Sequence, residues 1–341
     1  MKPYESDVLY IAEISANHLG SLERAHKLID AAAAAGATSV KFQTYTPDTM
    51  TLDLPEFSVI DGHELWGGRT LYSLYAEAMT PWEWHAELFS HCREVGVIPF
   101  SSPFDPSAVE FLESLNAPMY KIASLETSDH ELIKLVSETG KPTIISTGAT
   151  QFDEIRDLVD VFRSTGNEDL TLLVCTSSYP ARPQDANLRR MELLKREFGV
   201  KVGLSDHTLG VGVSIAAITL GATAIEKHLT LKRSDGGADG AFSMEPSEFQ
   251  TLVYEGNSAR SALGSAEWKI QQSENESRRL RRSLYIVQNV NEGDLVTKSN
   301  VRAIRPGGGS SPALLGTIIG QKFRNSYSVG TPLTLDKIEI N

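Results

Sequence analysis

Two short segments decide the fold, Gly203-Leu-Ser-Asp-His-Thr208 and Ile225-Glu-Lys-His-Leu229. In each, an apolar run ends in polar residues that include a histidine, and a segment of helix length lies between the two. This pattern predicts two parallel strands joined by a helix. Because parallel strands end at the same edge of a sheet, His207 and His228 are expected to meet there. That edge is the predicted functional site.

The same alternation of apolar runs and helical segments extends from residue 8 to about residue 263. Eight such units over ~250 residues favour a (β/α)8 barrel, an α/β fold of the TIM type, over an open doubly wound sheet. The predicted strands are residues 8–16, 38–45, 97–102, 118–124, 142–147, 170–178, 201–207 and 222–230. The clearest predicted helices are residues 21–35, 81–95, 129–139, 152–164, 210–220 and 245–263.

The last part of the chain has a different character. A polar, charged stretch over 271–279 lacks apolar periodicity, so we predict a barrel domain over 1–264, a linker over 265–279 and a small domain over 280–341. The small domain contains an internal echo, in which residues 293–301 resemble residues 330–338. Each of these segments predicts a glycine turn, a short strand and a threonine N-cap that opens a brief helical turn.

Composition narrows the class of protein. The 341 residues are 41% hydrophobic and 22% charged, as in ordinary globular proteins, and the formal net charge of −12 argues against nucleic acid as a partner. No leader-like start and no membrane-length apolar stretch are seen, so a cytoplasmic protein that acts on small molecules is expected. Cys92 and Cys175 fit reduced, buried thiols that serve core packing.

Polar residues gather where the predicted strands end, which is the face that carries the chemistry in barrel enzymes. Alternate residues of a strand share a face, and one face looks into the barrel. By this rule four polar pairs look into the barrel mouth: Lys41 with Gln43, Ser177 with Tyr179, Ser205 with His207, and Glu226 with His228. Barrel closure puts the last strand beside the first, so Glu13 should lie near His228.

These residue types permit several reactions. His207 and His228 could bind a divalent ion that polarises a carbonyl oxygen, although histidines hydrogen-bonded at the rim remain an alternative. Glu13 and Glu126 are candidate acid/base groups, with salt bridges at the rim as the alternative. An anion site is predicted from Lys41, Lys121, Ser102, Ser124, Ser146 and Ser205. A lysine that snorkels to solvent, or a Schiff-base lysine, remains an alternative reading.

Six ordered motifs resemble the sialic acid synthase family along nearly the whole chain. They are the two histidine segments together with Ile11-Ala-Glu-Ile-Ser-Ala-Asn-His18, Val40-Lys-Phe-Gln-Thr44, Tyr120-Lys-Ile-Ala-Ser124 and Ile145-Ser-Thr-Gly148. The resemblance implies a barrel followed by a C-terminal antifreeze-like (SAF, β-clip type) domain. It also implies condensation of phosphoenolpyruvate with an acylamino sugar to give a nine-carbon 2-keto acid and phosphate.

Within that family, the chain is most similar to the branch that makes pseudaminic acid. The stretches that carry this similarity are residues 12–18, 65–72, 81–84, 101–105 and 233–239, followed by Phe242 and Ser243. Ser177 stands where sialic acid synthases tend to have asparagine. The expected sugar is therefore 2,4-diacetamido-2,4,6-trideoxy-L-altrose, with the legionaminic and N-acetylneuraminic precursors as alternatives.

The resemblance also implies roles for single residues. A divalent metal, typically Mn²⁺ but with Mg²⁺ or Co²⁺ possible, would be held by His207 and His228, and Glu13 and Glu126 would serve proton transfer. Phosphoenolpyruvate would contact Lys41, Ser102, Lys121, Ser124, Ser146 and Ser205. The sugar would contact Gln43, Ser177, Tyr179, Asp239 and Arg305. Arg305 would come from a partner subunit, which implies a domain-swapped homodimer; a Schiff-base aldolase and a non-catalytic sugar-binding protein remain the rival functions.

Overall fold

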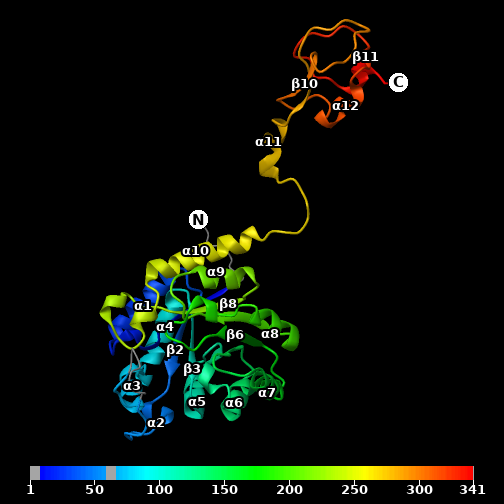
Figure 1. The fold of residues 1–341 in the computed structure, drawn as a ribbon. Helices are drawn as coiled ribbons and strands as arrows, with labels where there is room; N and C mark the ends of the chain where they lie inside the picture. Colours follow the sequence, from blue (N-terminus) through cyan, green and yellow to red (C-terminus); the bar gives the residue numbers. More distant parts are fainter. Residues whose placement is uncertain (1–7, 59–66, 341) are drawn as a thin grey trace. The chain divides into compact units, whose positions relative to one another are not determined.

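The computed structural model describes residues 8–58 and 67–340, and in these residues eight parallel strands close into a barrel (Figure 1). Each strand pairs with the next along the chain, and β8 pairs with β1, so the predicted (β/α)8 barrel is confirmed. The strands are β1 Leu9–Glu13, β2 Ser39–Thr44, β3 Ile98–Pro103, β4 Tyr120–Ile122, β5 Thr143–Ser146, β6 Leu170–Cys175, β7 Lys201–Ser205 and β8 Ala224–His228.

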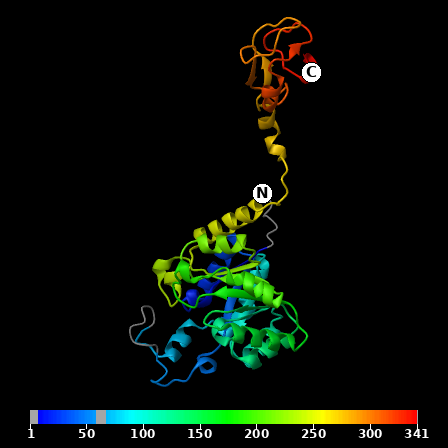
Figure 2. The same ribbon diagram turned by 45° about the vertical axis from the view of Figure 1, so that its right-hand side comes forward.

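Helices surround the barrel, and both views show α10 lying along α9 (Figures 1 and 2). Those around the strands are α1 Leu22–Ala34, α4 His85–Glu94, α5 Pro106–Ser114, α6 His130–Glu138, α7 Phe152–Arg163, α8 Arg190–Phe198, α9 Gly212–Thr219 and α10 Pro246–Ala262. The predicted helices are all present, except that residues 82–84 form a 3-10 turn before α4. Two short helices, α2 Pro47–Met50 and α3 Leu71–Ala78, occupy the long connection between β2 and α4.

Several predicted strands extend too far at their carboxyl ends. The ladders stop at Glu13, Cys175 and Ser205, whereas the prediction ran to residues 16, 178 and 207. Local side-chain bonds explain the early end of β7, because the Asp206 carboxylate accepts hydrogen bonds from the backbone N–H and the hydroxyl of Thr208. His207 therefore lies on a loop just beyond its strand.

The inside of the barrel is filled below its mouth. One apolar layer there consists of Ile11, Phe100, Ile144, Leu173 and Ala224. A Cβ added to Gly203 would lie 2.3 Å from the carbonyl oxygen of Ala224, so β7 approaches β8 as closely as it does only because residue 203 has no side chain. Within the part of the chain that the structure describes, the open space inside the barrel thus lies at the carboxyl ends of the strands.

The structure divides into two compact units, Met1–Gly264 and Ser265–Asn341. The second unit includes the segment predicted as a linker, and exposed turns η7 Gln272–Glu274 and α11 Asn275–Arg279 form within it. The second unit contains two small antiparallel sheets. One pairs β9 Ser283–Ile286 with β10 Val301–Ile304, and the other pairs β11 Lys322–Phe323 with β12 Ile338–Glu339. Helix α12 Leu315–Ile318 packs into the hydrophobic core of this unit, which also contains Leu284, Val301 and Phe323.

The internal echo in this unit has a structural counterpart. Gly293 and Gly330 both have a positive φ, of 82° and 89°, which glycine adopts without strain. Val296 and Leu333 then occupy equivalent places and are both buried in the unit's core. Thr334 precedes the 3-10 turn η9 Leu335–Lys337, at the position predicted for the N-cap, but its side chain makes no capping hydrogen bond to the turn. The two halves thus contribute matching residues to one core.

Some sequence expectations meet the structure only in part. Both cysteines are buried and unpaired, as expected. No helix in residues 8–58 and 67–340 is long and apolar enough to cross a membrane. Residues 1–7, on which the expectation about a leader rests, lie outside the described residues, as do Leu65 and Trp66 of the stretch 65–72.

The fold should lose stability in acid, because His85 is buried in neutral form. Its Nδ1 lies 3.2 Å from the Pro81 carbonyl oxygen and its Nε2 lies 2.8 Å from the Thr44 hydroxyl, and burial lowers its pKa to about 4. Between about pH 6.5 and pH 4 the unfolded chain binds a proton that the folded chain does not. The contribution of His85 to the free energy of unfolding is therefore complete above pH 6.5 and falls below it, by up to about 1.4 kcal/mol per pH unit.

Urea unfolding from pH 4 to pH 7 tests this expectation. His85→Phe should be less stable at pH 7, because it loses both hydrogen bonds, yet its stability should depend less on pH. His130→Asn, at an exposed position that opens α6, should keep the slope of the parent protein. An unchanged slope in His85→Phe would contradict the assignment of His85 as the titrating group.

Candidate active site

A cavity of about 530 Å³ opens at the carboxyl ends of the barrel strands. Its volume lies in the range of small-molecule sites. All predicted site residues line it except Ser102 and Arg305: Glu13, Lys41, Gln43, Lys121, Ser124, Glu126, Ser146, Ser177, Tyr179, Ser205, His207, His228 and Asp239. The strand-end and parity arguments therefore place nearly the whole set around one cavity.

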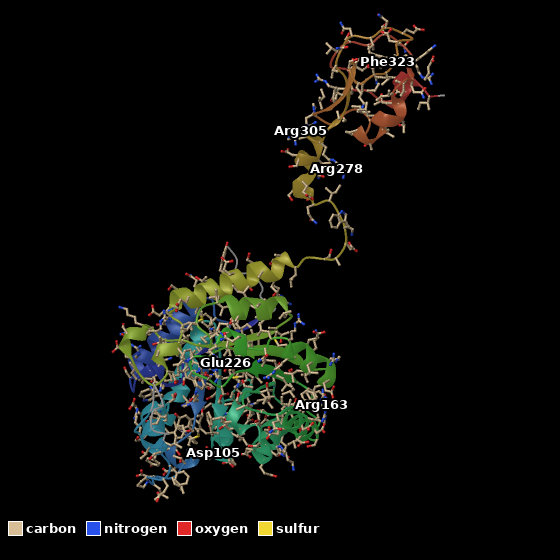
Figure 3. The ribbon with its side chains drawn as sticks, in the orientation of Figure 1. Asp105, Arg163, Glu226, Arg278, Arg305 and Phe323 are labelled. Atoms are coloured by element: carbon tan, nitrogen blue, oxygen red, sulfur yellow. The ribbon has the colours of Figure 1, made fainter. Side chains whose placement is uncertain are left out.

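A buried cluster of charges forms the floor of the cavity, and Figure 3 places Glu226 inside the barrel unit. The Lys41 ammonium lies 2.8 Å from Glu13 Oε2 and 3.9 Å from Glu226 Oε1, and all three side chains are almost inaccessible to solvent. Gln43 donates to Glu13 Oε1 at 2.8 Å. Lys41 also donates to the hydroxyl of Ser102 at 3.3 Å, so Ser102 supports the lysine from behind instead of lining the cavity.

The cluster separates the proton affinities of its two carboxylates. Burial raises the pKa of Glu13 to about 7, and the neighbouring charge of Glu226 adds to the rise, while Lys41 opposes it. Burial also works to raise the pKa of Glu226, but Lys121 and Lys41 together hold that pKa below its usual range. Burial would lower the pKa of Lys41, and the two carboxylates outweigh it and raise that pKa. Glu13 is thus suited to exchange a proton near neutral pH, and Glu226 serves as a fixed negative charge.

The two histidines meet at the rim, as predicted, with ring centroids 5.4 Å apart. Nδ1 of His207 lies 3.0 Å from the Thr176 carbonyl oxygen, and since a carbonyl can only accept, this nitrogen carries the proton in the neutral ring and Nε2 keeps its lone pair. Burial would lower the pKa of His207, but the neighbouring Cys175 outweighs burial and raises that pKa. Burial lowers the pKa of His228 well below its ordinary value, and its Nδ1 has no hydrogen-bond partner. Both rings are therefore held as potential ligands.

A divalent metal fits this donor set. Neutral imidazoles bind borderline cations such as Mn²⁺. Nδ1 of His228 has no hydrogen-bond partner in the protein, so it is available as a metal ligand. In the described part of the chain, no group of three or more His, Cys, Asp or Glu residues is arranged to enclose an ion. An ion here would complete its shell with substrate and water, as in open catalytic sites. Glu13 pairs with His228 in the barrel register, as barrel closure predicted.

Most of the residues predicted to bind an anion lie beside the charged floor, and Ser177, predicted to contact the sugar, lies among them. Lys121 is buried and donates to the carbonyl oxygen of Ile122 at 2.9 Å, which leaves donor capacity for a ligand. The hydroxyls of Ser146 and Ser177 are buried without hydrogen-bond partners, and Ser124 accepts from the backbone N–H of Gly148 at 3.0 Å. Buried polar atoms are normally paired, so these free hydroxyls indicate where ligand oxygens would bind.

Four of the residues predicted to contact a sugar, Gln43, Ser177, Tyr179 and Asp239, line the same cavity. Asp239 accepts hydrogen bonds from the Ser15 hydroxyl and, at 3.4 Å, from the backbone N–H of Ala16. The ring of Tyr179 packs 4.5 Å from that of His207. Arg305 belongs to the C-terminal unit, where it is exposed just after β10 (Figure 3), and its predicted role stays a prediction.

Several residues of the cavity were not predicted as site residues. Glu226 could have been included, because it shares a strand face with His228. Cys175 was assigned to core packing, yet its sulfur lies 3.9 Å from Nδ1 of His207 in the cavity wall. The largest omission is an apolar wall of the cavity. Most of its residues come from the connection between β2 and α4, and two come from the segments after β3 and β4: Tyr45, Met50, Leu71, Leu74, Tyr75, Ala78, Phe104 and Leu125. No local pattern marks these side chains as facing a cavity.

Comparison with known proteins identifies the family. Residues 28–268 match the NeuB family, and residues 281–339 match the SAF domain. The chain belongs to the NeuB family. The resemblance to sialic acid synthases is thus confirmed, as are the predicted barrel and SAF domain. The predicted type of activity, an enzyme that forms a carbon–carbon bond, is confirmed as well.

Curated relatives of this NeuB-family chain match it over nearly its whole length. Pseudaminic acid synthase of Helicobacter pylori is 44% identical over 330 residues, which cover 96% of this chain and 97% of the relative. Pseudaminic acid synthase of Campylobacter jejuni serotype O:2 is 40% identical, with 96% of each chain covered. N,N'-diacetyllegionaminic acid synthase of Legionella pneumophila is 35% identical, with 96% and 94% covered.

Solved structures agree with this assignment. The sialic acid synthetase of Leptospira borgpetersenii, in complex with citrate, superimposes with a TM-score of 0.71 at 31% identity, over 79% of this chain and 90% of that chain. The spore coat polysaccharide biosynthesis protein SpsE of Bacillus subtilis superimposes with a TM-score of 0.66 at 29% identity, over 98% and 96% of the two chains.

Removing the central lysine should disrupt the charged floor. Lys41→Met leaves Glu13 and Glu226 buried without the cation between them, and breaking a buried pair costs about 3–5 kcal/mol. We expect a loss of that size in the free energy of unfolding at pH 8, measured with urea. The matched control is Lys27→Met, which removes an exposed pair with Glu23 and should leave the free energy of unfolding nearly unchanged. Equal losses in the two variants would contradict the role of Lys41.

Proposed function

We propose that this chain is a pseudaminic acid synthase. It would condense phosphoenolpyruvate with the open-chain form of 2,4-diacetamido-2,4,6-trideoxy-L-altrose and water, giving pseudaminic acid and phosphate. The observation that carries the proposal is the cavity itself, in which two buried lysines, unpaired serine hydroxyls, a carboxylate with a pKa near 7 and two imidazoles lie together. The similarity to two enzymes named pseudaminic acid synthase supports the choice of sugar.

The proposed mechanism assigns each part of the cavity a task. Lys41, Lys121 and the serine hydroxyls bind the phosphate and carboxylate of phosphoenolpyruvate, which aims its methylene carbon at the sugar aldehyde. A divalent ion, proposed to be Mn²⁺, would be held by His207 and His228 and would supply Lewis-acid polarisation of the aldehyde oxygen. The new carbon–carbon bond joins the methylene carbon to the aldehyde carbon and leaves a cationic carbon that bears the phosphate.

Water then completes the reaction. Glu13, with its pKa near 7, accepts a proton as water adds to the cationic carbon, and the buried Glu226 stabilises the positive charge that develops nearby. The tetrahedral product loses phosphate by cleavage of the carbon–oxygen bond, which gives the 2-keto acid. Burial raises the pKa of Glu126, which suits this residue to protonate the aldehyde oxygen as the carbon–carbon bond forms. When phosphate leaves, Glu13 returns its proton to the phosphate oxygen and Glu126 takes up the hydroxyl proton of the tetrahedral intermediate.

The apolar wall bears on the identity of the sugar. A 2,4-diacetamido-2,4,6-trideoxy sugar carries three methyl groups, one on each acetamido group and one at C6. Met50, Leu71 and Leu74 supply apolar surface on which such methyl groups can be buried. An apolar pocket discriminates by about 10–200-fold for each such group, so a sugar with a hydroxyl at C6 should react less well.

Phosphate release from phosphoenolpyruvate tests the proposed function. With the diacetamido-trideoxyaltrose, kcat/KM should exceed that for N-acetylmannosamine, which lacks the C4 acetamido group and the C6 methyl group, by at least about 10-fold. Turnover with N-acetylmannosamine alone would overturn the choice of sugar, and no phosphate release with any sugar would favour a binding protein. Because burial lowers the pKa of Lys121, a Schiff base is the chemical rival. Borohydride trapping of pyruvate on Lys121 would support that rival.

We further propose that Arg305 acts on the sugar bound by a partner subunit, in a domain-swapped homodimer. Arg305→Ala and His207→Ala should each be inactive as homodimers. In a mixed dimer, the barrel with His207 intact would receive Arg305 from the other chain, so one site is restored. Co-expression with two affinity tags and measurement of phosphate release checks this. No recovery of activity in the purified mixed dimer would show that Arg305 acts within its own chain or not at all.

A further inference from the structure

A buried ion pair lies directly behind the two histidines. Asp206 precedes His207 on the loop after β7, and Lys227 precedes His228 on β8. The Lys227 ammonium lies 3.0 Å from Asp206 Oδ2, and the two residues are only 2% and 3% exposed. Neither residue lines the cavity. The pair thus connects the two histidine-bearing segments on the side away from the ligand.

The pair is part of a fully bonded network that fixes the loop after β7. Lys227 also donates to the carbonyl oxygens of Thr208, at 2.6 Å, and Gly210, at 3.2 Å, so all three of its protons are used. Asp206 Oδ1 accepts from Thr208, and Asp206 Oδ2 accepts from the Ser214 hydroxyl at 2.5 Å. The loop that carries His207 is thereby tied to β8 and to the first turn of α9.

Stability alone does not account for such a pair. Replacing a buried ion pair by neutral groups of similar volume is often neutral or stabilising, because both charges lose their hydration on folding. What the pair does supply is a fixed geometry between two adjacent segments, each of which carries one imidazole. Groups that orient metal ligands in this way commonly change metal affinity by about 10–100-fold when they are removed.

We propose that Asp206 and Lys227 are positioning residues that hold His207 and His228 at the separation required by one divalent ion. The inference rests on the proposed metal role of the two histidines. It assigns the pair a task in metal binding in addition to the hydrogen bonds by which it fixes the loop. Metal affinity should therefore fall when this pair is neutralised, and it should not fall when an ion pair away from the histidines is neutralised.

The test uses the full-length double variant Asp206→Asn with Lys227→Met, which removes both charges and nearly preserves the volumes. The asparagine amide oxygen can still accept from Thr208. The affinity for Mn²⁺, measured by isothermal titration calorimetry, should fall by about 10–100-fold. The urea midpoint should fall, because methionine leaves the carbonyl oxygens of Thr208 and Gly210 without a donor, so the affinity is measured without urea in variants that circular dichroism shows to be folded. The matched control is Asp169→Asn with Lys201→Met. This exposed pair, 3.0 Å apart, likewise joins two adjacent strand segments, here those of β6 and β7, and the control should bind Mn²⁺ like the parent protein.

The outcomes separate the inference from its premise. A parent protein that binds no Mn²⁺ sinks the proposed metal role, whereas parental affinity in the folded double variant overturns the inference alone. If the double variant does not fold, Ser214→Ala decides the matter, because it removes one donor to Asp206 without changing a charge. A weaker Mn²⁺ affinity in Ser214→Ala supports the inference, and an unchanged affinity overturns it.

Discussion

The buried ammonium of Lys41 between Glu13 and Glu226 is the constraint on which the cavity depends. Two carboxylates so close together in a buried site would repel each other, and one of them would have to take up a proton. Lys41 stabilises the negative charge of both carboxylates. Glu226 is stabilised further by Lys121, so its pKa falls below that of Glu13. One carboxylate therefore stays charged while the other titrates near neutral pH. Acid/base capacity in this barrel follows from how its lysines are placed.

Much of this site could be predicted from the sequence because a barrel strand imposes a simple rule. Alternate residues face inward and the carboxyl ends share one rim, so the positions of Lys41, Gln43 and Glu226 follow from counting. The rule fails where the strand ends early. His207 lies on a loop, and its position depends on the Asp206 turn and on the bond between its imidazole and Thr176. Such side-chain bonds cannot be read from periodicity.

The apolar side of the cavity illustrates a different limit. Leu74 belongs to a short helix with an ordinary apolar pattern, which is equally consistent with packing against the barrel. It faces the cavity because the long connection after β2 folds back over the strand ends. Cys175 presents the same difficulty. The sequence pattern around a buried strand cysteine is the same whether its thiol packs in the core or lines a cavity. Both assignments require the tertiary structure.

The two units have separate hydrophobic cores, and this affects how the protein should denature. The cluster around Leu284, Val301 and Phe323 shares no residue with the cluster of the barrel. Unfolding of the whole chain therefore need not follow a single transition, and a spectroscopic signal reports the unit in which its chromophore lies. Trp82 stacks on Phe111 within the barrel unit, whereas Trp268 is fully exposed at the start of the second unit. The change in tryptophan emission during denaturation is thus a reporter of the barrel, and the C-terminal unit needs a probe of its own.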